Sequence, residues 1–157
     1  MKHTIFYTFA IIAIGFLLFL NFRHGKTDIG NQEVIHTSEA PEPIGPYSQA
    51  IRKGNAYFIS GQVAINPKSG KLDTNDITTE TKLVMNNIKA ILVSAHLNMN
   101  DISKTTIYLT DLKNFKIVND IYGTFFGAGP FPARETVQVV ALPKGAHIEI
   151  SAIAVKE

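Results

Sequence analysis

Apolar positions follow a regular spacing over most of the chain after residue 33. Runs that are rich in β-branched and aromatic residues, or in which apolar and polar residues alternate, predict strands. Two longer segments, residues 79–97 and 114–126, carry apolar residues at helical spacing and are predicted to be helices. The strands are expected at residues 34–36, 49–53, 56–60, 102–109, 136–141 and 146–155, with Gly54-Asn55 as a hairpin turn between the second and the third.

The order of these elements is strands, helix, strand, helix and two final strands, which predicts an α+β fold with two helices on one face of a mixed sheet. We expect the last two strands to be joined by a short turn through Pro143-Lys144-Gly145. Ile148, Ile150 and Ile153 cannot all lie on the same face of a strand. Because a sheet covered on one side leaves its other face open, self-association is the economical way to bury the remaining apolar side chains.

The amino-terminal end differs from the rest of the chain. Residues 4–22 contain no charge over 19 positions, and as a helix they would reach about 28 Å, the thickness of one hydrocarbon core. A cleaved signal peptide is the alternative, but the run is long for one and no small-residue cleavage site follows it. We therefore predict a transmembrane anchor or uncleaved signal at residues 1–24, a linker at 25–32 and a domain at 33–157. A short tail before the apolar run favours an N-in, single-pass anchor that exports the domain to the periplasm.

Composition excludes several classes of function. The chain has no cysteine, which rules out a disulfide framework, a thiolate metal site and a cysteine nucleophile. No two histidines stand at HxxxH or HExxH spacing, so we expect no metal site. The net charge of +2 comes from the amino-terminal end, because from Thr27 onward 12 basic residues face 13 acidic ones. A domain of this charge is not expected to bind nucleic acid.

Two charged residues near the end of the chain are candidates for chemistry. Arg134 follows a proline-bound segment, and a guanidinium fixed there can bind a carboxylate through two parallel hydrogen bonds. The alternative is a surface charge paired with Glu135. Glu149 lies in a mostly apolar strand, so it either faces water or sits in a pocket where burial tunes it for proton transfer. If the two last strands pair directly, Glu149 lies opposite Gln138 on the same face as Arg134 and Thr136, about 13 Å along the strand from Arg134.

Several short motifs occur in a characteristic order after the linker. These are IGPYSQ at residues 44–49, ISGQ at 59–62, KTTIYL at 104–109, DLKNF at 111–115, FPAR at 131–134 and LPK at 142–144, followed by IEI at 148–150 and AIAV at 152–155. Together they cover about 124 residues and resemble the reactive intermediate deaminase family, called Rid or YjgF.

This resemblance implies a chorismate-mutase-like α+β fold that forms a homotrimer, with three sites in the clefts between subunits. It also implies a cofactor-independent activity of the 2-iminobutanoate/2-iminopropanoate deaminase type. The substrates would be reactive enamines and imines such as 2-aminoacrylate, which are hydrolysed to a 2-oxo acid and ammonia. A non-catalytic trimer that binds small carboxylates is the alternative. Ribonuclease activity, attributed to some relatives, is disfavoured by the near-neutral charge of the domain.

The resemblance also assigns roles to individual residues. Arg134 would bind the substrate carboxylate, and Glu149 would position the attacking water or move protons. Thr136 stands at a catalytic position where many members have cysteine or threonine, and Asn119 would reach in from the neighbouring subunit. The remaining predicted site residues would line or support the substrate pocket: Tyr47, Ser60 and Gly61. Without the resemblance, Tyr47 is interpreted as a capped core tyrosine and Ser60 as a strand hydroxyl bonded to the backbone.

The chain departs from the family pattern at three places. Glu135 puts a carboxylate next to the arginine that should bind an anion, but strand alternation predicts that its side chain takes the opposite face. Ser151 replaces a second acidic residue. The apolar amino-terminal segment is the largest departure, because members of the family are typically soluble and intracellular.

Overall fold

The computed structural model describes residues 32–127 and 129–157. It contains one six-stranded sheet with the strand order β1-β2-β3-β6-β4-β5. All neighbouring strands are antiparallel except β4 and β5, which run parallel, so the sheet is mixed. The strands are β1 (Gln32–Ile35), β2 (Ala50–Lys53), β3 (Ala56–Gln62), β4 (Ile102–Leu109), β5 (Ala133–Gln138) and β6 (Ile148–Val155).

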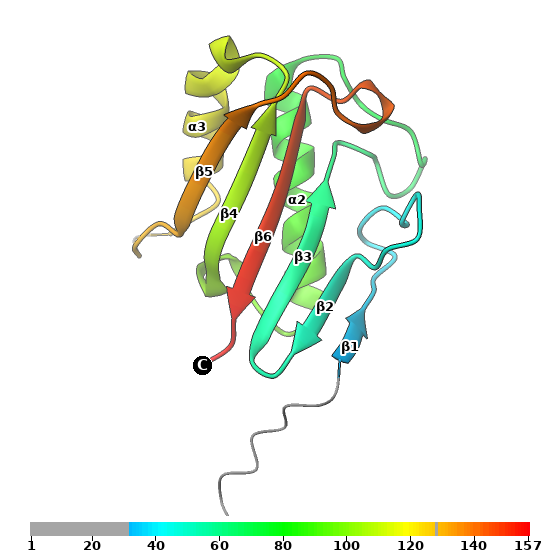
Figure 1. The fold of residues 1–157 in the computed structure, drawn as a ribbon, viewed down its shortest axis with the longest axis vertical. Helices are drawn as coiled ribbons and strands as arrows, with labels where there is room; N and C mark the ends of the chain where they lie inside the picture. The colour runs from blue at the N-terminus through cyan, green and yellow to red at the C-terminus, as the bar shows by residue number, and fades with distance from the viewer. Residues whose placement is uncertain (1–31, 128) are drawn as a thin grey trace, which may run out of the picture. The chain divides into compact units, whose positions relative to one another are not determined.

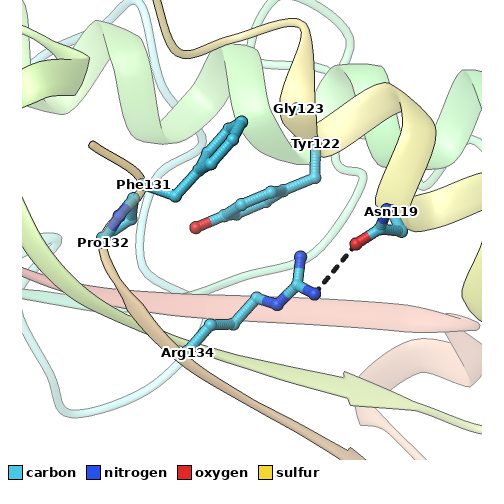
Figure 2. Close-up of a pocket in the computed structure, with 6 residues that line it drawn as sticks. All are labelled: Asn119, Tyr122, Gly123, Phe131, Pro132 and Arg134. Carbon is cyan, nitrogen blue, oxygen red and sulfur yellow. Dashed lines mark hydrogen bonds between the residues drawn. The ribbon is translucent and has the colours of Figure 1, made fainter. Parts of the chain in front are cut away.

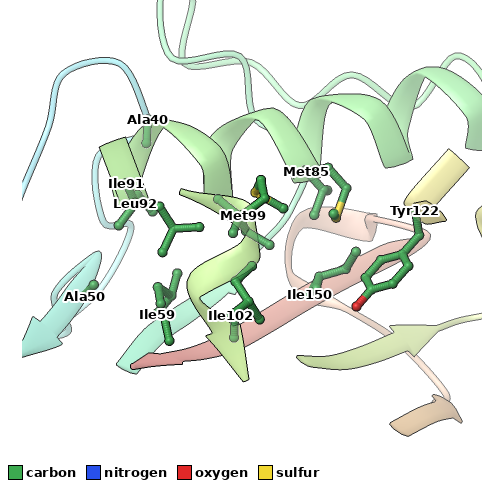
Figure 3. Packing of buried hydrophobic residues seen from close by; sticks show 14 of the residues in the cluster. Ala40, Ala50, Ile59, Met85, Ile91, Leu92, Met99, Ile102, Tyr122 and Ile150 are labelled. Atoms are coloured by element: carbon green, nitrogen blue, oxygen red, sulfur yellow. The ribbon is translucent and has the colours of Figure 1, made fainter. Parts of the chain in front are cut away.

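Two helices, α2 (Ile77–Ser94) and α3 (Phe115–Gly123), cover one face of this sheet, as predicted (Figure 1). Three short 3-10 turns connect the elements, at Met99–Asp101, Leu112–Asn114 and Pro143–Gly145. The core lies between the helices and the sheet. Ile91 and Leu92 of α2 are buried and point towards Ile59 of β3, and Met85 of the same helix lies over Ile150 of β6 (Figure 3). The fold class predicted from the sequence is confirmed.

Helix α2 begins two residues before the predicted start because Asp76 caps it. The Asp76 carboxylate accepts hydrogen bonds from the backbone N–H of Thr79 at 2.9 Å and from its hydroxyl at 2.8 Å. Such a cap satisfies backbone donors that have no partner inside the helix. These two hydrogen bonds are also the main reason why the pKa of Asp76 is lowered.

Several other boundaries differ from the expected ones. Helix α3 ends at Gly123, three residues before the predicted end, and the chain turns at residues 124–126. Strand β1 starts at Gln32, the last residue of the predicted linker. Strand β5 occupies residues 133–138 instead of 136–141, because its parallel pairing with β4 runs from Lys104 opposite Ala133 to Leu109 opposite Gln138.

The predicted hairpin between the last two strands is wrong. β4 lies between β5 and β6, so the connection from β5 to β6, residues 139–147, crosses the end of β4 and is not a tight hairpin turn (Figure 1). Glu149 therefore stands opposite Tyr108 of β4 and not opposite Gln138. The sequence pattern identified both strands but carried no information on which neighbour each one pairs with.

The localisation predicted from the sequence is also corrected. The predicted membrane segment, residues 4–22, lies outside the described residues. Helix α2, the longest helix of the described part of the chain, carries Glu80, Lys82 and Lys89. Within residues 32–127 and 129–157 no helix is long and apolar enough to cross a membrane, so the fold gives a membrane-anchored, periplasmic placement no support.

Candidate functional site

Arg134 is held against helix α3. Its Nη2 donates a hydrogen bond to the Oδ1 of Asn119 at 2.9 Å (Figure 2). The rings of Tyr122 and Phe115 lie over the guanidinium, with centroids 4.9 and 5.8 Å from its central carbon. Contacts of this kind fix the orientation of the planar guanidinium. Among the described residues only Asn119 hydrogen-bonds to Arg134, so its other N–H groups are available to an anion.

A cavity of about 290 Å³ lies beside this guanidinium. Its polar end is formed by Arg134 and Asn119, and the rest of the wall is largely apolar. Tyr122 is almost fully buried, and its hydroxyl is bonded to the hydroxyl of Thr105 at 2.9 Å. Burial is the main reason why the pKa of Tyr122 is raised, so this hydroxyl stays protonated. The other lining residues are Gly123, Phe131 and Pro132.

A second cavity, of about 250 Å³, contains Glu149. The Glu149 carboxyl is half-buried, and this burial raises its pKa above the ordinary 4.5. It packs directly on Gly61 of β3: a Cβ atom built on Gly61 would lie only 2.7 Å from the Cδ of Glu149. A glycine is therefore required at position 61 for the carboxyl to occupy this place. The other lining residues are Ile44, Tyr47, Ser60, Val63 and Pro143.

Two of the predicted pocket residues have ordinary hydrogen-bond partners. The Tyr47 side chain is exposed at the mouth of the second cavity, and its hydroxyl accepts a hydrogen bond from the N–H of Ile44 at 3.2 Å. It is therefore not a core tyrosine. The Ser60 hydroxyl donates to the backbone carbonyl of Ser48 at 2.7 Å, as expected for a strand hydroxyl bonded to the backbone. Ser60 lines the cavity while its hydroxyl is already engaged.

The predicted site residues divide into two groups on opposite faces of the sheet. Glu149 lies between Ile148 and Ile150, which are fully buried under the helices, so its side chain takes the open face. Arg134 stands opposite the buried Thr105 and takes the helix face. Thr136 follows it two residues later on that same face. The expectation that Arg134 and Glu149 share one face is thus wrong within a single chain, because it assumed that β5 pairs with β6.

The position of Asn119 also bears on its predicted role. It hydrogen-bonds to Arg134 of the same chain, so these two residues come from one subunit. The first group therefore consists of Arg134, Asn119 and Thr136, and the second group consists of Tyr47, Ser60, Gly61 and Glu149.

Glu135 takes the open face, as strand alternation predicts. Its carboxylate pairs with Lys104 at 3.0 Å and accepts a hydrogen bond from the Thr106 hydroxyl at 3.2 Å. The contact with Lys104 is the main reason why the pKa of Glu135 is lowered. The alternative in which Arg134 pairs with Glu135 is therefore wrong, and Glu135 does not compete for the Arg134 guanidinium.

Sequence reasoning missed two features. Tyr122 was counted only as an apolar position of a helix, although it stands three residues after Asn119 and therefore on the same side of α3. The fully buried Glu80 accepts hydrogen bonds from the backbone N–H of His147 at 2.7 Å and from its Nδ1 at 3.0 Å. These residues are 67 positions apart, and no local pattern points to this contact. Within the described residues no cluster of three or more His, Asp or Glu side chains could hold a metal.

Comparison with known proteins identifies relatives over the whole described fold. A family model described as endoribonuclease L-PSP matches residues 37–156. A RutC family protein of Pyrococcus horikoshii is 51% identical over 126 residues, which span 80% of this chain and 99% of that protein. A mouse protein named 2-iminobutanoate/2-iminopropanoate deaminase is 45% identical over 125 residues, which span 80% of this chain and 92% of that protein.

Solved structures have the same fold. A Yersinia pestis protein described as a member of the conserved Rid protein family, with unknown function, has a TM-score of 0.78 and 48% identity, covering 80% of this chain and all of that one. Escherichia coli TdcF, solved with bound serine, has a TM-score of 0.77 and 40% identity, covering 80% of this chain and 99% of that one. The likeness thus extends over nearly the full length of these proteins.

Proposed function

The chain belongs to the endoribonuclease L-PSP family, also called Rid or YjgF, and on this premise we propose that it hydrolyses 2-imino acids to 2-oxo acids and ammonia. The observation that carries the proposal is the Arg134 guanidinium, fixed by Asn119 at the polar end of a cavity whose other end is apolar. Such a fork matches a carboxylate. Relatives named 2-iminobutanoate/2-iminopropanoate deaminase in mouse and human, 45% and 42% identical, support the choice of imine as the reacting group.

Hydrolysis of an imine requires the protein mainly to position the substrate and the attacking water and to move protons. A water oxygen bonds to the imine carbon, and the water gives up a proton while the nitrogen gains one. In the resulting carbinolamine the hydroxyl proton passes to the nitrogen, the C–N bond breaks as the C=O bond forms, and ammonia leaves the 2-oxo acid. Glu149 suits the proton transfers because burial brings its pKa closer to neutrality, and a base of this kind contributes about 10²–10⁴-fold to a rate. Thr136, two residues from Arg134, is the third residue proposed for catalysis, and Tyr47, Ser60 and Gly61 line the pocket.

We further propose that the working site combines two chains of a homotrimer. Arg134 and Glu149 lie on opposite faces of the sheet of one chain, so one substrate can reach both only if a second copy supplies one of them. The open face also carries an apolar row across four strands, formed by Val34, Ile51, Phe58 and Ile153. Val34 and Phe58 are 60% and 46% exposed in the single chain, and a neighbouring subunit would cover them.

Mixed trimers test both proposals. An amino-acid oxidase generates the imine in place, and semicarbazide captures the imine that survives. Assayed at imine concentrations below KM, the Arg134→Ala and Glu149→Gln chains alone are each expected to keep about 1% of the wild-type rate or less. Co-expressed in equal amounts, they are expected to recover about a quarter of the wild-type rate, because random trimers with both kinds of subunit keep one intact site of three. Recovery would fail if both residues of a site came from one chain, and an inactive wild-type trimer would contradict the deaminase assignment itself.

A second candidate is a non-catalytic binding module for small carboxylates. The bound serine of the TdcF relative favours it, because serine presents the same carboxylate as an imino acid. The wild-type protein separates the two functions. A deaminase removes the imine faster than spontaneous hydrolysis does, whereas a binding module binds 2-oxo acids without changing that rate.

Gly61 provides an independent test of Glu149. Gly61→Ala is expected to lower kcat by about 10- to 100-fold, because the new methyl group displaces the Glu149 carboxyl and a shift near 1 Å can cost that much. The melting temperature should change little, since the clashing atoms are the end of a flexible side chain. Gly45→Ala is the control, because a Cβ there meets Tyr47 at an ordinary 3.5 Å. Equal effects of both substitutions would contradict this role of Gly61.

A further inference from the structure

The cavity beside Arg134 has a part that the carboxylate anchor does not use. We call this part the side-chain recess and define it by Gly123, Phe131 and Pro132 (Figure 2). Its walls are apolar, while Arg134 and Asn119 form the polar end. A cavity with one cationic end and one apolar end matches a ligand that has a carboxylate at one end and an apolar group at the other.

The aromatic wall of the recess is supported from behind. Phe131 packs edge-on against Phe126 with ring centroids 5.9 Å apart, and Phe126 packs on Tyr122 at 4.8 Å. Tyr122 is in turn fixed by its bond to Thr105 and lies over the Arg134 guanidinium. Phe131 itself is 63% exposed, an unusual state for a phenylalanine whose neighbour Phe126 is buried. A bound apolar group would cover this ring and would gain from burying it.

Gly123 lines the recess without contributing a side chain. A Cβ atom on Gly123 would have no atom within 4 Å, and the residue lies at the end of α3 without a positive φ. Neither backbone conformation nor packing therefore requires a glycine at this position. Because Gly123 lines the cavity, we expect a leucine here to take up part of its volume, which makes residue 123 the simplest place to change how much room the recess offers.

We propose that the side-chain recess binds the side chain of the substrate, so that the protein prefers 2-imino acids with bulky apolar side chains, aromatic ones included. This inference rests on the proposed deaminase function. With the carboxylate held by Arg134, a methyl side chain leaves most of the 290 Å³ cavity to water. A branched or aromatic side chain reaches Phe131 and Pro132, and each additional methylene in an apolar pocket is worth about tenfold or more in kcat/KM.

The test compares two leucine substitutions in the full chain. Gly123→Leu fills the recess, and Thr124→Leu places the same side chain one residue further on, at an exposed position that does not line the cavity. Imines are generated from alanine, leucine and phenylalanine. We expect wild type and Thr124→Leu to favour the phenylalanine and leucine imines. We expect Gly123→Leu to lose about tenfold or more on these two relative to its rate on the alanine imine.

Two results separate the inference from the proposed function. If the wild type removes the alanine imine but shows no preference for bulky side chains, or if Gly123→Leu leaves the preference unchanged, the recess inference is overturned and the deaminase function stands. If the wild type removes no imine, the proposed function is wrong. The affinities for phenylpyruvate and pyruvate, measured by calorimetry, then test whether the recess binds an apolar side chain. Tighter binding of phenylpyruvate that is lost only in Gly123→Leu supports it, and equal affinities overturn it.

Discussion

Replacing Arg134 with alanine is expected to lower kcat/KM for imine hydrolysis by about 10³-fold, which corresponds to about 4 kcal/mol. The loss should appear mainly in KM. The substrate carboxylate does not react, so the guanidinium binds it about equally in the ground state and in the transition state. Initial rates over a range of imine concentrations, with melting temperature as a check of folding, measure this effect.

Two further arginine variants make the result specific. Arg134→Lys keeps the charge but loses the planar fork and the geometry of the bond to Asn119, so it should recover only part of the loss. Arg52→Ala removes an exposed arginine of β2 that is paired with Glu33, and β2 lies near the opposite edge of the sheet from β5. This substitution should leave the rate within about twofold of wild type. A loss in Arg52→Ala as large as that in Arg134→Ala would indicate a general charge effect and contradict a specific carboxylate site.

Local patterns were sufficient for most of the fold. The strand at residues 102–109 and the first hairpin were predicted from β-branched residues and a Gly-Asn turn, and these signals act within a few residues. Strand pairing is different. β6 inserts between β3 and β4, which precede it by many residues, and its own alternation only says which side chains share a face. The predicted β5–β6 hairpin failed for this reason.

The candidate site shows the same division between local and long-range information. Strand alternation correctly separated Arg134 from Glu135, because side-chain direction is a property of a single strand. The relative position of Arg134 and Glu149 depends on which strands pair, and the sequence pattern wrongly placed both side chains on the same face of the sheet. The cover of Arg134 by Tyr122 and Phe115 depends on how α3 packs on the sheet, so it was visible only once both elements were in place.

Glu149→Gln is expected to lower kcat by about 10²–10³-fold with little change in KM, because the amide keeps the size of the carboxyl but cannot accept a proton from water. In the wild type, activity requires the carboxylate form. The rate should therefore fall as the pH drops through the pKa of Glu149, which burial raises above 4.5. The pH at which the rate falls on the acid side should be higher than for an ordinary glutamate. This fall should be absent from the pH profile of the residual activity of Glu149→Gln.

The same substitution is expected to stabilise the protein at neutral pH. Because burial raises the pKa of Glu149 in the folded state, the folded protein holds this proton more tightly than the unfolded chain does. The contribution of this group to wild-type stability is then greatest below pH 4.5 and declines as the pH rises through the raised pKa. The amide of the Glu149→Gln variant does not titrate, so the melting temperature of the variant should exceed that of the wild type at neutral pH and match it more closely in acid.

Glu135→Gln is the control with the opposite sign. The pKa of Glu135 is lowered by its contact with Lys104, so removing this carboxylate costs stability at neutral pH, where the wild-type group is ionised. Thermal melts of both variants across the acid range measure the contrast. A variant that is both less active and more stable identifies Glu149 as a group held in an unfavourable environment for the sake of its reactivity, whereas a loss of stability in Glu149→Gln at neutral pH would contradict this role.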